Sequence, residues 1–170
     1  MSLDFEDVQG VAEALKEVRS RGRVVDREGL SESLHRAIRF LKEYGSEELR
    51  FSTALPGGVE VGVGVYKFGE GYYVVREAVD TEEYKYRYAS IEYTRRASRA
   101  VERYVDGVAG VKKAVERKLD TLKKQPESEE RNKQIRDLES TREALELLMN
   151  RLLVALKDMA KELEKQGLLE

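Results

Sequence analysis

Phosphate recognition is the chemistry that the residue types of EYKYRYASIEYTRRASRAVERY (residues 83–104) suit best. Guanidinium groups on one helix face fit the backbone of nucleic acids, and tyrosine rings can stack on bases. Read as a helix, the segment presents five basic residues together: Lys85, Arg95, Arg96, Arg99 and Arg103. Its inward side presents three tyrosines: Tyr86, Tyr93 and Tyr104. The alternative is that the tyrosines are core residues and the arginines a solvated face, paired with Glu92, Glu102 and Asp106.

Catalytic chemistry finds little support in the residue types. The single histidine, His35, stands beside the apolar stripe of Leu34 and Ile38, and we expect it at the surface. One histidine without any cysteine supplies no set of metal ligands, and no serine stands out as a nucleophile beside it. GVGVYKFG (62–69) resembles a phosphate-binding glycine loop, but it lies in a strand pattern that no helix follows. We therefore expect no enzymatic activity, no catalytic residue, no cofactor and no metal.

Composition favours a soluble, cytoplasmic protein. The chain has 170 residues, of which 38% are charged, a net charge of −2 and no cysteine. A chain of this length can bury a core without disulfides, and its net charge gives no overall attraction to nucleic acid. We find neither an apolar run as long as a membrane span nor the pattern of a signal peptide. The high charge content is typical of thermophilic proteins.

Two helices are predicted at the N-terminal end, from apolar residues that recur at helical spacing. The first covers residues 5–20. The pair Val24 and Val25 forms a short apolar link after it. Asp26 is a suitable N-cap for the second helix, which Gly45 ends.

Three strands are predicted next, because apolar residues alternate over residues 49–55, 59–65 and 72–79. Pro-Gly-Gly and Gly-Glu-Gly separate the strands and suit tight turns. We therefore expect a three-stranded antiparallel meander with one apolar face. Gly62 and Gly64 fall on the other face, where a neighbouring aromatic ring could lie over them: Tyr66, Phe68 or Tyr72.

The remainder of the chain is predicted to be a helical hairpin. Asp80 and Glu83 have the spacing of a capping box, from which a helix could continue to Lys124. QPESEE (125–130) is the turn, and its serine is a suitable cap for the last helix. The alternative for residues 84–93 is a fourth strand, because tyrosines alternate there. We expect the helix.

Both long helices carry two rows of residues at seven-residue spacing, which is the pattern of a coiled coil. The rows of the first helix are Val101, Val108, Val115, Leu122 and Ile91, Ser98, Val105, Lys112, Leu119. Those of the second are Leu138, Leu145, Leu152, Met159 and Ile135, Arg142, Met149, Leu156, Leu163. The short turn makes the helices antiparallel and selects the register in which Val108 faces Leu145, Val105 faces Met149 and Ile91 faces Leu163. The helices also carry opposite net charges, which favours their pairing.

One layer of this seam is irregular, because Lys112 and Arg142 meet in it. Two buried like charges would be costly, so we expect both side chains to extend outward towards glutamates. Three glutamates are close enough in sequence: Glu116, Glu139 and Glu143. The alternative is a weak point in the hairpin, where an anion or a partner binds.

The segment LELLMNRLLVALKDM (145–159) is apolar on more than one side of its helix. Leu147 and Val154 point away from the seam, and Leu153 points sideways. One partner helix cannot cover all of these side chains. We expect either the N-terminal helices and sheet, or another copy of the protein, to pack against them.

Residues 22–45, GRVVDREGLSESLHRAIRFLKEYG, followed by a predicted hairpin, resemble part of a winged-helix DNA-binding domain. That resemblance implies a separate recognition helix before the hairpin. No turn between Leu30 and Tyr44 gives such a helix its own start, so we assign no family.

The expected fold is α+β, with two N-terminal helices, a three-stranded antiparallel meander and a long C-terminal antiparallel helical hairpin. Residues 1–80 would form a small N-terminal unit and residues 81–170 the hairpin, packed together as one domain. The expected function is non-enzymatic: self-association as a homo-oligomer, or docking of a protein partner, through the hairpin and without a membrane. The alternative is an accessory subunit of a nucleoprotein complex that binds nucleic-acid backbone through the arginine-rich face.

Overall fold

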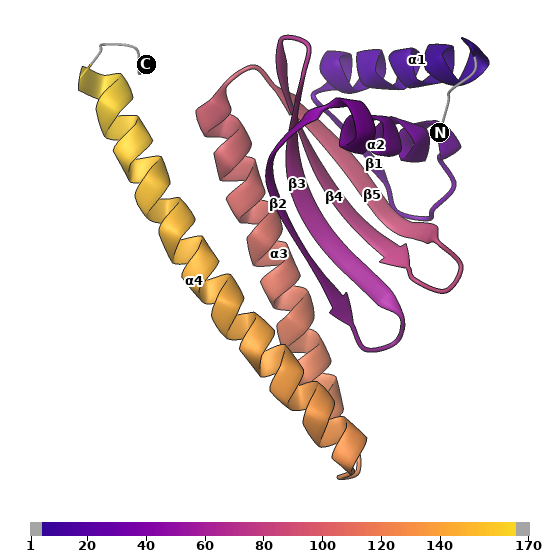
Figure 1. The fold of residues 1–170 in the computed structure, drawn as a ribbon, viewed down its shortest axis with the longest axis vertical. Helices are drawn as coiled ribbons and strands as arrows, with labels where there is room; N and C mark the ends of the chain where they lie inside the picture. Colours follow the sequence, from indigo (N-terminus) through magenta and orange to yellow (C-terminus); the bar gives the residue numbers. More distant parts are fainter. Residues whose placement is uncertain (1–4, 166–170) are drawn as a thin grey trace.

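The computed structural model describes residues 5–165, which form a mixed α+β fold of four helices and one antiparallel sheet of five strands (Figure 1). The helices are α1 (Phe5–Arg21), α2 (Glu32–Tyr44), α3 (Ala97–Lys123) and α4 (Glu129–Lys165). The strands are β1 (Arg23–Asp26), β2 (Ser46–Leu55), β3 (Val59–Phe68), β4 (Gly71–Asp80) and β5 (Lys85–Thr94). The order across the sheet is β1-β5-β4-β3-β2, so that β2 to β5 form a meander and β1 returns to pair with β5.

The strands β2, β3 and β4 occupy the region in which apolar residues alternate, but they belong to a larger sheet than the predicted meander. Glycines make the two connections possible, because Gly57 and Gly69 adopt φ values of +103° and +63°. One glycine of β3 is covered by an aromatic ring as the pattern indicated: a Cβ atom on Gly64 would lie 2.8 Å from the ring of Tyr66, whereas one on Gly62 would meet Phe51 O and Ser52 Cβ at 3.2 Å.

The helix predicted from residue 81 is wrong over residues 85–94, which form β5 and pair with β4 and β1. Asp80 Oδ1 accepts hydrogen bonds from the backbone N–H groups of Glu82 and Glu83 at 3.0 and 3.1 Å, as a helix N-cap does. Here the same bonds close a turn, in which Tyr84 adopts φ +55° and the chain returns along β4. The domain boundary expected at this point therefore falls inside a β-hairpin.

The short apolar link at Val24 and Val25 is a strand as well, because β1 pairs with β5. Asp26, expected to cap the second helix, ends β1 instead. The N-cap of α2 is Ser31, whose hydroxyl accepts a hydrogen bond from the backbone N–H of Leu34 at 3.4 Å. From there α2 runs uninterrupted to Tyr44, without the separate recognition helix that the winged-helix resemblance implies.

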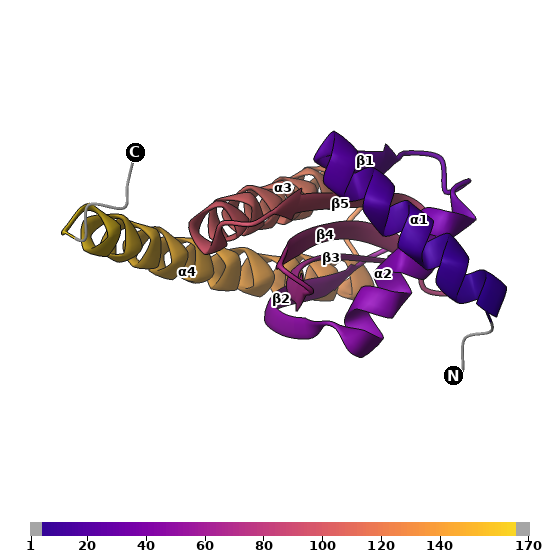
Figure 2. The ribbon, with the colours of Figure 1, turned by 90° about the horizontal axis from the view of Figure 1, so that it is seen from above.

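Helices cover both faces of the sheet, whereas the patterning indicated one apolar face (Figure 2). On one face, α1 and α2 pack over a surface rich in aromatic rings, among them Tyr66 and Tyr73. On the other face, α3 packs over a valine-rich surface that includes Val63, Val65 and Val74. The layers are therefore α1 and α2, the sheet, α3, and finally α4 on the far side of α3.

The helices α3 and α4 form a hairpin around the predicted turn, and Ser128 caps α4 by accepting a hydrogen bond from Arg131 N at 3.1 Å. Eight residues of the predicted rows are buried in this core: Val105, Val108, Val115, Leu119, Leu122, Leu138, Leu145 and Leu152. Ile91 is not part of the seam, because it lies in β5 and is buried in the core of α1 and α2. Its predicted partner Leu163 falls outside the side chains that the structure describes, and the detailed register stays a prediction.

Candidate interaction surface

The outward side of α4 carries exposed aliphatic side chains in its C-terminal half. Leu147 is 67% exposed, Val154 59% and Leu153 45%. On the same helix, Leu145 and Leu152 are buried in the core that α4 shares with α3. We call Leu147, Leu153 and Val154 the outer α4 surface. Within the described part of the chain, nothing buries it.

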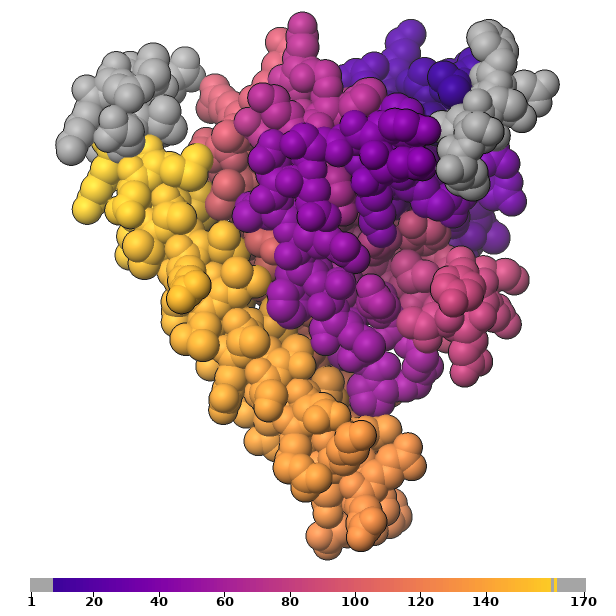
Figure 3. Space-filling model, viewed as in Figure 1, coloured from indigo at the N-terminus to yellow at the C-terminus, as the bar shows by residue number. Residues whose placement is uncertain are grey.

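Helix geometry explains why these residues are not buried between α3 and α4. An α-helix turns by about 100° per residue, so Leu147 and Val154 lie on the side opposite Leu145. The two are seven residues apart, which places them about 10.5 Å from each other along the axis on nearly the same side. The helices α3 and α4 lie together near their turn and separate towards the C-terminal end of α4 (Figures 1 and 2). In the space-filling view, α4 forms one edge of the molecule (Figure 3).

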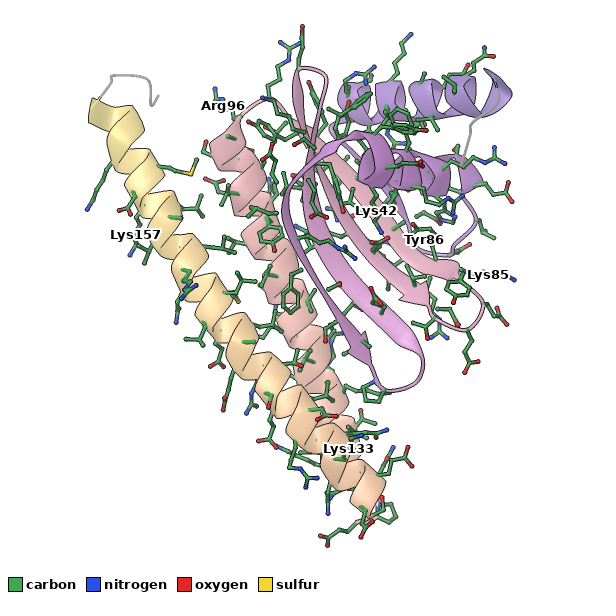
Figure 4. All side chains as sticks on the ribbon, in the orientation of Figure 1. Lys42, Lys85, Tyr86, Arg96, Lys133 and Lys157 are labelled. Carbon is green, nitrogen blue, oxygen red and sulfur yellow. The ribbon has the colours of Figure 1, made fainter. Side chains whose placement is uncertain are left out.

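Charges on this part of α4 are divided between its two ends. Residues 139–146 contain three glutamates and one arginine, a net charge of −2. Residues 151–161 contain three basic residues and one aspartate, a net charge of +2. Lys157 belongs to the basic part and extends away from α3 (Figure 4). Leu147 therefore follows the acidic segment directly, and Leu153 and Val154 lie within the basic segment.

The irregular layer of the seam contains both signs of charge. Lys112 Nζ lies 3.8 Å from Glu116 Oε1 on its own helix and 3.5 Å from Glu146 Oε1 on α4. Arg142, the other basic residue of this layer, is half-buried on α4. Of the expected glutamates, Glu116 is thus a partner of Lys112. Carboxylates therefore lie next to Lys112, and the anion or partner site considered for this layer stays a prediction.

The five basic residues of the arginine-rich segment do not form one stripe, since half of that segment is a strand. Lys85 begins β5 and Arg95 follows its end, which at ~3.3 Å per residue separates them by about 33 Å. Figure 4 shows Lys85 and Arg96 at opposite ends of β5. Three of the arginines lie near carboxylates: Arg95 at 3.8 Å from Glu70, Arg99 at 3.5 Å from Glu102 and Arg103 at 2.7 Å from Glu92. Nucleic-acid binding through these residues stays a prediction that this arrangement does not favour.

The three tyrosines of the same segment pack inside the protein. The ring of Tyr86 stacks on His35 with 4.5 Å between centroids, and that of Tyr93 is tilted against Tyr73 at 5.0 Å. Tyr104 is 1% exposed, in the core beneath α3. Tyr86 and Tyr93 face α1 and α2, whereas Tyr104 belongs to α3 and packs on the other face of the sheet, so the three rings form no common platform for bases.

His35 is buried, and the expectation that it lies at the surface is wrong. Its Nε2 atom lies 2.7 Å from Asp26 Oδ2, which is also buried. Asp26 accepts three further hydrogen bonds, from the backbone N–H groups of Glu28, Leu30 and Ser31 at 3.1 to 3.3 Å. The pair thus holds the connection between β1 and α2 in place.

The hydrogen bonds of this connection favour the ionised form of the Asp26 carboxyl group. Burial raises the pKa of Asp26, but the backbone hydrogen bond from Ser31, the bond with His35 and the bonds from Glu28 and Leu30 together lower it below its usual value. The sequence gives little indication of the pair of Asp26 and His35, because the two residues are nine positions apart and no known motif links them. Among the described residues, no group of three or more histidine, cysteine or acidic residues could hold a metal ion.

Comparisons with protein-family models, with curated proteins and with solved structures find no match for this chain. None of the helices described between residues 5 and 165 combines the length and the apolar character needed to cross a membrane.

Proposed function

We propose that this protein is a non-enzymatic interaction protein that self-associates through the outer α4 surface. The observation that carries the proposal is the exposure of Leu147, Leu153 and Val154 on a helix whose other side buries Leu138, Leu145 and Leu152 in the hairpin. Fully burying a leucine or valine side chain contributes roughly 1.5–3 kcal/mol, and a two-fold axis repeats each contact. An interface is therefore the simplest reason for aliphatic side chains at these positions.

The proposed occupant is the α4 helix of a second copy, in antiparallel orientation. Two aliphatic residues at seven-residue spacing suit a helix as partner, because that spacing repeats on a helix of the same kind. An antiparallel pair centred between Asn150 and Arg151 brings Leu147 of each copy to Val154 of the other. It also brings the acidic segment 139–146 to the basic segment 151–161 of the second copy, which favours association.

Light scattering behind size exclusion tests the association on the full chain. We expect a mass that rises with concentration to twice the 19.5 kDa of one chain. The variant Leu147→Asp/Val154→Asp should stay at the one-chain mass, because the interface would bury two carboxylates. Leu30→Asp is the matched control, since Leu30 is 75% exposed but lies far from α4, and it should associate like the wild type. A wild-type mass of one chain at all concentrations would contradict the proposal.

Engineered cysteines test the orientation, and the natural chain has no cysteine to interfere. Disulfides need Cα atoms roughly 4.4–6.8 Å apart. In the antiparallel pair, position 147 meets position 154, so mixed Leu147→Cys and Val154→Cys chains should form a covalent dimer under mild oxidation. Either variant alone should not, because identical positions would be offset by about 10.5 Å along the axis. Efficient dimer formation by one variant alone would contradict the antiparallel arrangement.

A further inference from the structure

A hollow of about 350 Å³ lies between the sheet and α3, on the face opposite α1 and α2. From the sheet, it is lined by Val61, Arg76 and Tyr88; from α3, by Gly110, Val111 and Arg117. We call it the α3 hollow. Its size lies within the range of about 300–1,000 Å³ that is usual for small-ligand pockets, and its mixture of apolar walls with a few polar groups is usual as well.

Gly110 has no packing role that would explain a glycine inside a helix. A Cβ atom at Gly107, one turn earlier, would lie 2.6 Å from Val63 Cγ2, so Gly107 permits the close packing of α3 on the sheet. A Cβ atom at Gly110 would meet nothing within 4 Å, although this residue lines the hollow. Glycine is unfavourable in a helix interior, and the absence of a side chain here keeps the hollow open.

The charges that reach the α3 hollow are positive. Arg76 and Arg117 line it, and Arg23 Nη2 donates to the hydroxyl of Tyr88 at 3.5 Å beside it. Among the described residues, no carboxylate lies within 4 Å of any of these three guanidinium groups. Glu77 borders the hollow through its backbone only, since side chains alternate along β4 and its carboxylate pairs with Lys42 of α2 on the other face.

The nearest acidic side chains on this face already have a partner. Glu92 and Asp106 both pair with Arg103, at 2.7 and 3.3 Å. Arg76 Nη2 donates to the backbone carbonyl of Arg103 at 3.1 Å, which holds the guanidinium group in place. A guanidinium has five N–H donors, so Arg76 retains others for a ligand. Arg117 is exposed at the rim, and its Nε donates to its own helix, to Lys113 O at 3.4 Å.

The hydroxyl of Tyr88 reports the positive potential on this side of the sheet. Burial raises the pKa of Tyr88, but hydrogen bonds with Ser90 and Arg23 and the charges of Arg23 and Arg76 outweigh burial and lower it. The surroundings therefore favour negative charge at this point.

We propose that the α3 hollow binds a small organic anion: a carboxylate or phosphate group joined to an apolar body. The charged group would lie against Arg76, with the Tyr88 hydroxyl as a further donor, because a guanidinium group binds either anion in bidentate geometry, and Arg117 would attract the anion from the rim. The apolar body would lie against Val61 and Val111, where Gly110 leaves room. This site lies away from the outer α4 surface, so the proposal does not depend on self-association.

Calorimetric titration of the full chain with phenyl phosphate, benzoate and inorganic phosphate tests the proposal. We expect saturable binding of phenyl phosphate or benzoate, at least tenfold tighter than inorganic phosphate, which lacks the apolar body. The preference between the first two identifies the charged group. No saturable binding of either at millimolar concentration, or equal binding of inorganic phosphate, would overturn the proposal.

Variants locate the site. Arg117→Gln should weaken binding several-fold, because it removes a positive charge at the rim, and Gly110→Leu should abolish binding by filling the space with a side chain. Arg136→Gln removes an exposed arginine of α4 and is the matched control, so its affinity should equal that of the wild type. Circular dichroism melting confirms that each variant is folded. Unchanged affinity in both folded Arg117→Gln and folded Gly110→Leu would overturn the assignment.

Discussion

Leu145 and Leu147 lie two residues apart on α4 and have opposite surroundings. Leu145 is completely buried against α3, whereas Leu147 is 67% exposed. Gly107 and Gly110 form a similar pair on α3: a Cβ atom would collide with the sheet at the first and meet nothing at the second. In each pair, one residue lies at a closed position that the packing of the fold uses, and the other lies at an open position where nothing covers it. The difference teaches that the closed positions maintain stability, whereas the open positions leave surface or space uncovered.

The largest expected effect is on the closed side of α4. Leu145→Ala should lower the free energy of unfolding by about 2–5 kcal/mol, because it removes buried methyl groups and leaves a cavity in the hairpin core. Urea unfolding monitored by circular dichroism measures the change. A loss below about 1 kcal/mol would mean that the hairpin core is not packed as described and would remove the contrast with Leu147.

The second effect concerns a buried charged side chain, the carboxylate of Asp26. Asp26→Asn should lower stability at neutral pH by about 1–3 kcal/mol, because buried donors lose an ionised acceptor. The pKa of Asp26 is lowered in the folded state, so its contribution is present above the unfolded pKa of about 3.9 and is lost as pH falls through the folded pKa.

Urea unfolding between pH 7 and pH 2 measures this dependence. The wild type should lose more stability on acidification than Asp26→Asn, which has no carboxylate at this position to protonate. Asp120→Asn, an exposed carboxylate on α3, is the control and should follow the wild type. Parallel curves for the wild type and Asp26→Asn would exclude this role of Asp26.

The third effect concerns Gly107, the closed position on α3. Gly107→Ala should destabilise the protein by about 1–2 kcal/mol, because the new methyl group meets Val63 Cγ2 at 2.6 Å and the strain exceeds the gain in helix propensity. The midpoint of thermal unfolding measures the change. Stabilisation by this substitution would show that α3 does not pack tightly on β3 at this point.

The fourth effect has the opposite sign. Gly110→Ala should stabilise the protein by about 0.5–1 kcal/mol, because alanine favours a helix and nothing lies within 4 Å of its methyl group. The same thermal measurement compares it directly with Gly107→Ala. If both glycines responded equally, the distinction between the closed and the open position on α3 would be broken.

The smallest effect on stability is expected at the open side of α4. Leu147→Ala should change the unfolding free energy by less than about 0.5 kcal/mol at concentrations at which the chain is monomeric. The same substitution should weaken association several-fold in sedimentation experiments. A large loss of monomer stability would show that Leu147 serves the fold rather than an interface.

Local patterns in the sequence predicted much of the fold. Alternation over residues 49–55, 59–65 and 72–79 indicated β2, β3 and β4, and seven-residue spacing indicated the core of the α3–α4 hairpin. The prediction failed at Asp80, because the hydrogen bonds of an N-cap and of a hairpin turn are the same at that residue. The prediction that five basic residues share one helix face was wrong for the same reason, because residues 85–94 form a strand. His35 was misplaced because its partner Asp26 lies in another element.

The sequence by itself determined which segments are amphipathic and with what period, because side-chain spacing along the backbone is a local property. It also determined that α4 has more apolar sides than one helix can cover. Only the tertiary structure decided that residues 85–94 join the sheet, that β1 completes it and that the α3 hollow stays open. Those outcomes depend on partners distant in the chain, because a strand becomes stable only when a neighbouring strand satisfies its backbone hydrogen bonds.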